Sequence, residues 1–164
     1  MRLNWNLFKV VCFLQMLATA FFAITAFITL FQASDIYFLF ESIAFALMSS
    51  LAILALNILG SNYPDKPITG RQKSIFNWLF LLNFLLLTFL FGLVFAEYGL
   101  MRSLPHLAGQ SIFSLSFELW LPFLINVSLL IFQFIILYGL YSIRRQLYIN
   151  FFKNKRFEFE SEAL

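Results

Sequence analysis

The stretch SIFNWLFLLNFLLLTFLFGLVFAEY, residues 74–98, decides the fold class of this chain. Its 25 residues carry a single charge, that of Glu97 near the end. A helix rises about 1.5 Å per residue, so this run is long enough to cross the ~30 Å hydrocarbon core of a bilayer with some tilt. Three further apolar runs, at 7–31, 37–59 and 117–141, repeat the pattern. The sequence therefore predicts four transmembrane helices.

The composition of the whole chain agrees with a membrane protein. Hydrophobic residues make up 62% and charged residues 12%, against ~45–50% and ~25% in soluble domains. We expect an all-α polytopic protein, an antiparallel four-helix bundle over 1–141, followed by a cytoplasmic tail at 142–164 that is first basic and then acidic. The short connection at 32–36 makes the first two helices antiparallel neighbours, with Ser34 or Asp35 capping the second and Gly60 ending it.

Basic residues are divided unevenly between the two ends of the predicted helices. The first and third connections together contain only Arg102. The other ten are Arg2, Lys9, Lys66, Arg71, Lys73, Arg144, Arg145, Lys153, Lys155 and Arg156. Because Lys and Arg are retained on the cytoplasmic side, this division places both termini in the cytoplasm. The net charge of +3 then reflects membrane topology and attraction to anionic lipid, and not nucleic-acid binding.

Each predicted helix carries one stripe of polar or small residues among bulky apolar ones. The stripes are Gln15, Thr19, Ala26 and Thr29; Ser42, Ala46, Ser50 and Asn57; Asn83, Leu90 and Glu97; and Asn126 with Gln133. In lipid, such residues line helix interfaces, where amides bond across helices. We expect interhelical polar contacts from Gln15, Asn57, Asn83, Asn126 and Gln133. Asn83 and Asn126, both near the bilayer midplane, are the favoured bonded pair; the alternative is that they line a polar path.

Several charged groups lie at the predicted outer helix ends. Glu41, Glu97, Glu118 and His106 could form an outward-facing binding site, although capping and solvated charge are the simpler interpretation. No two of these potential ligands have the i, i+3 or i, i+4 spacing of a helical metal motif, so no metal site is predicted. Cys12, the only cysteine, cannot form an intrachain disulfide.

The tail interleaves basic and apolar residues. Arg144, Arg145, Lys153, Lys155 and Arg156 are predicted to contact anionic lipid, with Leu147, Ile149, Phe151 and Phe152 inserting beside them. The alternative is that the fourth helix simply continues into the cytoplasm. No HExxH, phosphate-binding glycine loop or CxxC pattern occurs, so we expect neither enzyme activity nor a cofactor.

Two segments resemble a known family. PDKPITGRQKSIFNWL at 64–79 is similar in hydropathy and spacing to the cytoplasmic loop of the bacterial membrane proteins called domain of unknown function number 2975, and YGLYSIRRQL at 138–147 resembles the end of their fourth helix. The resemblance implies a four-helix protein of the bacterial inner membrane, in some cases encoded beside a small helix-turn-helix regulator, with no established activity or catalytic residues.

These observations favour an accessory or interaction protein. Its partners would be the bilayer, anionic lipid at the cytoplasmic face, and another membrane protein or a second copy of the chain. The alternative from another class is a small transporter or channel subunit, in which Asn83, Asn126, Gln133 and Glu97 line a polar path.

Overall fold

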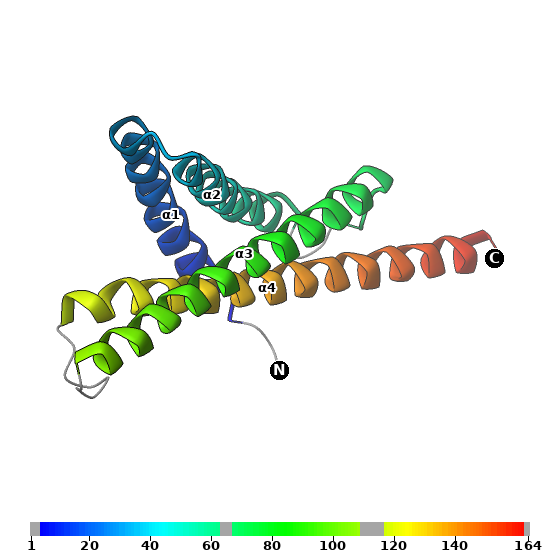
Figure 1. Cartoon of the computed structure of the whole chain (residues 1–164). Helices are drawn as coiled ribbons and strands as arrows, with labels where there is room; N and C mark the ends of the chain where they lie inside the picture. Colours follow the sequence, from blue (N-terminus) through cyan, green and yellow to red (C-terminus); the bar gives the residue numbers. More distant parts are fainter. Residues whose placement is uncertain (1–3, 63–66, 109–116, 163–164) are drawn as a thin grey trace.

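The computed structural model is all-α and describes residues 4–62, 67–108 and 117–162, with side chains over 4–60, 67–103, 117 and 120–153. Its four helices are α1 (Trp5–Ala33), α2 (Ile36–Asn62), α3 (Gly70–Ala108) and α4 (Phe117–Glu162) (Figure 1). Each contains a segment that is long and apolar enough to cross a membrane. The predicted all-α class and the four membrane-length helices are therefore confirmed, and they indicate an integral membrane protein.

Local hydrogen bonds set the turn between the first two helices. Ser34 adopts a left-handed conformation, with φ 53°, and its N–H donates to the carbonyl of Leu30 at 2.9 Å, which ends α1. The Asp35 carboxylate accepts from the backbone N–H of Tyr37 at 2.9 Å and so caps the first turn of α2. Of the two expected caps, Ser34 and Asp35, it is therefore Asp35 that caps α2. Gly60 does not end α2, which continues to Asn62, since one glycine in a last turn costs only about 1 kcal/mol.

The chain folds into two antiparallel hairpins. The most extensive interface joins α1 to α2, the next joins α3 to α4, and smaller interfaces join the two pairs, the largest of them between α1 and α4. Hydroxyl groups of α2 hold the first hairpin together: Ser42 donates to the carbonyl of Ala23 at 2.9 Å, and Ser49 donates to that of Met16 at 3.3 Å. The helices of the first hairpin are inclined to those of the second, so the four helix axes are not all nearly parallel to one another (Figure 1).

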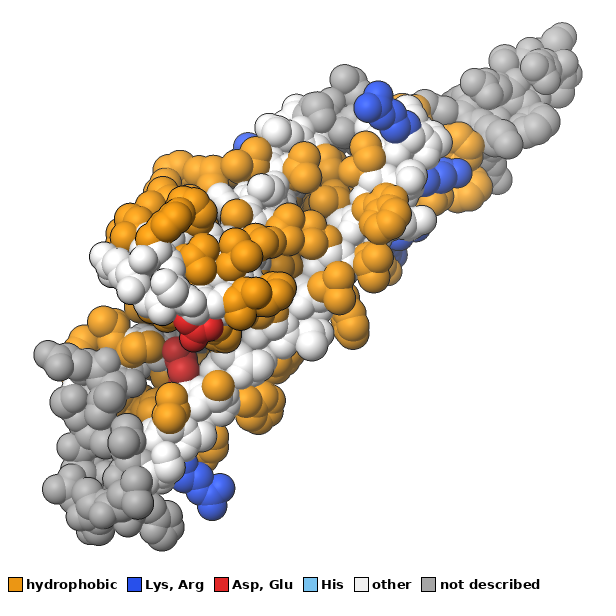
Figure 2. Space-filling view, turned by 45° about the horizontal axis from the view of Figure 1, so that its top comes forward, with side chains coloured by type: hydrophobic (Ala, Val, Ile, Leu, Met, Phe, Trp, Pro, Cys, Tyr) orange, Lys and Arg blue, Asp and Glu red, His pale blue; other side chains and the backbone are white. Residues whose placement is uncertain are grey.

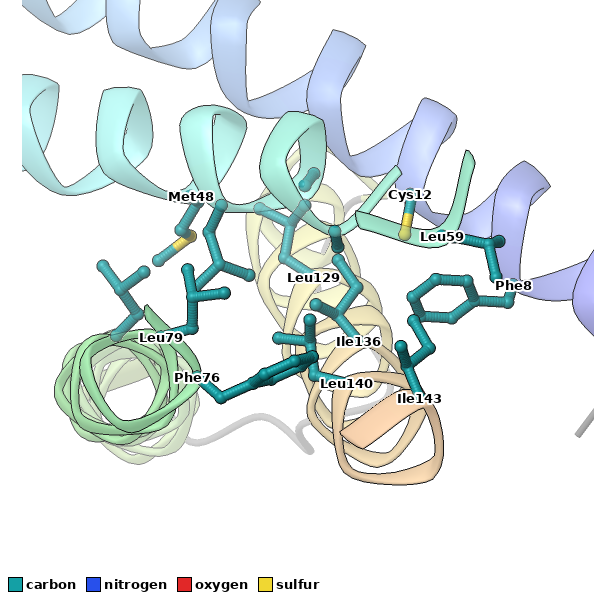
Figure 3. Packing of buried hydrophobic residues seen from close by; sticks show 14 of the residues in the cluster. Phe8, Cys12, Met48, Leu59, Phe76, Leu79, Leu129, Ile136, Leu140 and Ile143 are labelled. Atoms are coloured by element: carbon teal, nitrogen blue, oxygen red, sulfur yellow. The ribbon is translucent and has the colours of Figure 1, made fainter. Parts of the chain in front are cut away.

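The hydrophobic core lies where the hairpins cross. Figure 3 shows Phe8 of α1 above Ile143 of α4, with Leu59 of α2 beside it and Phe76 of α3 facing Leu140. Close approach at this crossing requires a glycine. A Cβ atom built on Gly139 would lie 2.0 Å from the Phe8 ring, so α1 and α4 meet here without a side chain between the ring and the α4 backbone.

The outward faces of the helices are strongly apolar. Phe21, Phe84 and Phe95 are 62%, 66% and 70% exposed, and apolar side chains cover much of the face seen in Figure 2. An apolar surface of this extent is unfavourable in water but suits a hydrocarbon solvent. The exposed phenylalanines therefore have a sufficient explanation in contact with lipid tails.

The fourth helix is continuous from the membrane segment into the predicted tail. No break occurs at the expected boundary between 141 and 142. Ile143 and Leu147 are fully buried, and the carbonyl of Leu147 accepts from the N–H of Ile68 at 3.2 Å. Leu147, predicted to insert into lipid, instead packs in the core. The first turns after 141 are therefore part of the folded body.

Candidate functional site

A pair of buried amides joins the two hairpins. The Nε2 group of Gln15 on α1 donates to Oε1 of Gln133 on α4, and both side chains are fully buried. Thr19, one turn further along α1, is also fully buried and donates to the carbonyl of Gln15 at 2.7 Å. The prediction that Gln15 and Gln133 make interhelical polar contacts is confirmed. Such a bond is worth roughly 0.6–2 kcal/mol in a membrane.

The second interhelical bond lies within the α3–α4 hairpin. Nδ2 of Asn126 donates to Oε1 of Glu97 at 2.8 Å. The expected bond between Asn126 and Asn83 is therefore wrong. Asn83 precedes Glu97 by 14 residues, which is ~21 Å along the helix, so in the register of this hairpin it lies far from Asn126. The hairpin register, which the side-chain stripes do not reveal, selects the partner.

Asn83 is a buried amide without a partner in the described part of the chain. Its side chain is fully buried, and neither carboxamide atom has a hydrogen bond there. The cost of an unsatisfied buried polar group is about 1–3 kcal/mol. Asn83 does lie on the interior face with Leu90, as its stripe predicts. It is the polar residue that the packing explains least.

The stripe predicted for α2 is only partly right. Ser42 is buried, but Ala46, Ser50 and Asn57 lie on the exposed side, and the Ser50 hydroxyl bonds to the carbonyl of its own helix at Ala46. Steps of four residues rotate by about 400°, so Ser50 lies ~80° from Ser42 around the helix. The inward face instead includes Ser49, which has the bond to α1 described above.

Two predicted outer-end carboxylates meet in a cavity of about 270 Å³ between the hairpins. We call it the outer cleft. Glu41 of α2, Glu97 of α3 and Asn126 of α4 supply its polar groups. Its apolar walls are Phe22, Phe45, Leu121, Pro122 and Ile125. Figure 2 shows acidic side chains in the notch where the two hairpins meet. The side chains of Glu118 and His106 lie outside the described residues, so their part in this site stays a prediction.

The carboxylates of the outer cleft have little compensation. Glu97 uses Oε1 to accept from Asn126, while its buried Oε2 has no hydrogen bond in the described part of the chain. Among the described side chains, Glu41 has no ion pair, and no Lys or Arg lines the cavity. The carboxylates of Glu41 and Glu97 therefore give the outer cleft a negative electrostatic character.

A second, apolar groove adjoins the outer cleft. It has a volume of about 290 Å³ and shares Phe22 and Ile125 with the cleft. Its remaining lining residues are Ala18, Leu124, Ser128, Leu129 and Phe132. The only hydroxyl among them, that of Ser128, donates to the carbonyl of Leu124 at 2.8 Å and is satisfied within α4. The groove therefore offers apolar contact alone.

The opposite end of the molecule carries cations on aromatic rings. The ammonium of Lys73 lies 5.5 Å from the ring centre of Tyr148, and the guanidinium of Arg144 lies 5.7 Å from the same ring. Such contacts hold the charged groups in place. Arg145 and Lys153 are exposed, while the side chains of Lys155 and Arg156 lie outside the described residues. Lipid contact by these five predicted basic residues stays a prediction.

Comparison with known proteins adds no assignment. No protein-family model, curated protein or solved structure matches this chain. The resemblance to domain of unknown function number 2975 therefore stays a prediction. Among the described residues, no three His, Cys, Asp or Glu side chains are grouped so that they could hold a metal ion.

Proposed function

We propose that this chain is an accessory protein of the bacterial cytoplasmic membrane, with both termini in the cytoplasm. It acts by binding lipid and a membrane partner and has no catalytic activity of its own. The uneven division of basic residues supports this orientation. The exposed basic residues near the end of α4 would then meet the anionic inner leaflet, where each contributes roughly 1 kcal/mol.

The packed interior favours this proposal over a conduit. The interior polar groups are separated along their helices by close-packed apolar side chains. Leu90 lies between Asn83 and Glu97 on α3, and Leu129 lies between Asn126 and Gln133 on α4; both are at most 2% exposed. Ile136, one turn beyond Gln133, is fully buried. Within the described side chains, the interior polar groups are therefore separated from one another by apolar residues and do not line a continuous path.

One observation favours the second candidate, a transporter or channel subunit. Several buried polar atoms lack partners in the described part of the chain, including both carboxamide atoms of Asn83 and Oε2 of Glu97. In an oligomer or a wetted state, water or another copy would supply those partners. Asn83, Asn126, Gln133 and Glu97 would then line a path.

Thiol labelling distinguishes the two candidates. In a Cys12→Ser background, the variants Asn83→Cys and Gln133→Cys should resist a membrane-impermeant thiosulfonate from both sides, because both side chains are fully buried. Ser103→Cys, on the exposed surface near the end of α3, is the positive control and should react. Rapid labelling at position 83 would overturn the accessory proposal and establish the water-filled path.

A further inference from the structure

The outer cleft and the apolar groove together have the shape and polarity of a site for an amphipathic ligand. They share the walls Phe22 and Ile125, so they follow one another between the two hairpins. Their volumes of about 270 and 290 Å³ each approach the ~300–1,000 Å³ of ordinary small-molecule pockets. One end is polar and the other apolar, which matches a headgroup followed by a hydrocarbon tail.

The sign of the charge in the cleft identifies the headgroup. Glu41 and Glu97 come from different helices, and no Lys or Arg among the described side chains lines the cavity. Asn126 donates to Oε1 of Glu97 and so orients the carboxylate, while Oε2 is buried beside the cavity and has no hydrogen bond in the described part of the chain. A ligand ammonium between the two carboxylates would supply the missing donor and the missing positive charge.

We propose that the outer cleft binds the ammonium group of a lipophilic amine whose hydrocarbon tail lies in the apolar groove. The tail would lie along Ala18, Leu124 and Phe132, and Phe22, common to both cavities, would contact the junction between head and tail. This inference is independent of the accessory role proposed above, because it rests only on the geometry of the two cavities between the hairpins.

The same geometry distinguishes a simple amine from a phospholipid. An ethanolamine phospholipid also carries an ammonium, but its phosphate would approach the same pair of carboxylates, and no described lining side chain is a Lys or Arg that would balance its charge. Like charges at short range in a low dielectric repel strongly. The preferred occupant is therefore a molecule with net positive charge, such as a single-chain alkylamine.

Binding of dodecylammonium to the purified full-length chain tests the proposal. The protein is held in phosphatidylcholine nanodiscs, and bound probe is measured by competition with a radiolabelled dodecylammonium tracer, using empty nanodiscs to subtract partitioning into lipid. We expect one saturable site per chain. Glu97→Gln and Glu41→Gln should each weaken the affinity by about tenfold or more, since each removes a charge-assisted contact. Dodecanol, which lacks the charge, should not compete.

Matched variants separate the head site from the tail site. Asp35→Asn removes a carboxylate at the same end of α2 but outside the cavity and should leave the affinity unchanged. Ala18→Phe fills the groove, so dodecylammonium should no longer bind more tightly than hexylammonium, while the affinity for hexylammonium should be unchanged. Circular dichroism and size-exclusion chromatography establish that each variant is folded.

Three results would overturn the proposal. The first is equal competition by dodecanol, which would mean that only the tail is recognised. The second is unchanged affinity in the folded Glu41→Gln/Glu97→Gln double variant. The third is competition by phosphatidylethanolamine at the same concentration as the amine, which would make the occupant a zwitterionic lipid. Failure of the thiol-labelling test above would leave all three readouts unaffected, so the two proposals fail separately.

Discussion

Replacing Gly139 by alanine tests whether the crossing of α1 and α4 is as close as the structure shows. The added Cβ would lie 2.0 Å from Cε2 of Phe8, 2.4 Å from Cδ2 and 2.8 Å from Cζ. Carbon atoms in ordinary contact are ~3.5–4.0 Å apart. The ring would have to move by roughly 1.5 Å or more. Phe8 is fully buried in the core, so its neighbours would have to move as well.

A matched glycine isolates the steric cost. An alanine at Gly92 of α3 would meet no heavy atom within 4 Å. Both substitutions gain roughly 1 kcal/mol of helix propensity, which cancels in the comparison. Overpacking a core typically costs about 1–3 kcal/mol. We therefore expect Gly139→Ala to be less stable than Gly92→Ala by about 1–3 kcal/mol, with Gly92→Ala neutral or slightly more stable than the natural protein.

The assay is unfolding by SDS in mixed micelles, followed by circular dichroism and by tryptophan fluorescence. Trp5, whose ring centre lies 6.0 Å from that of Phe8 in an edge-on arrangement, reports on the crossing itself. In a Phe8→Ala background the clash disappears, and Gly139→Ala should then be no more destabilising than Gly92→Ala. Equal stability of the two glycine variants in the natural background would refute the close crossing.

Three other outcomes follow from the polar contacts and the charge distribution. Asn126→Leu should lower the free energy of unfolding by about 1–3 kcal/mol because it leaves Glu97 unpaired. The effects of Asn126→Leu and Asn83→Leu on the free energy of unfolding in SDS should be additive, and a coupling energy above ~0.5 kcal/mol would contradict the separation of these residues. Gln15→Leu and Gln133→Leu should each be destabilising, while the double variant should cost less than the sum, so additivity here would argue against their bond. The full chain in nanodiscs should bind anionic lipid in preference to neutral lipid through Arg145 and Lys153, and added salt should weaken that preference. If the preference survives in the Arg145→Gln/Lys153→Gln variant, these two residues are not the lipid contacts.

The features predictable from the sequence are those with a local cause. Membrane-length helices follow from uninterrupted apolar runs, and the inward direction of Asn126 and Gln133 follows because residues seven apart share a helix face. Asp35 could be identified as one of two candidate caps, with Ser34, because both lie in a short polar turn before the second helix. None of these inferences needs knowledge of how one helix lies against another.

The remaining features depend on register and crossing angle. The partner of Asn126 is Glu97 and not Asn83 because the α3–α4 register places those two side chains together. Gly139 carries no sequence signal that separates it from Gly92, since both lie within apolar helices; only the path of α1 over α4 distinguishes them. Likewise, Glu41 and Glu97 are 56 positions apart in the sequence, and their meeting depends on how the hairpins cross.

The close contact at Gly139 and the outer cleft are two consequences of that crossing. Two inclined helices are nearest at one point and separate steadily away from it. Phe8 marks the near point between α1 and α4, and Phe22 lies 14 residues further along α1, which is ~21 Å. At that distance the hairpins have separated enough to leave a cavity. The small residue at the crossing thus permits the core to close at one end, while the same inclination leaves the carboxylates at the other end facing a space that the protein does not fill.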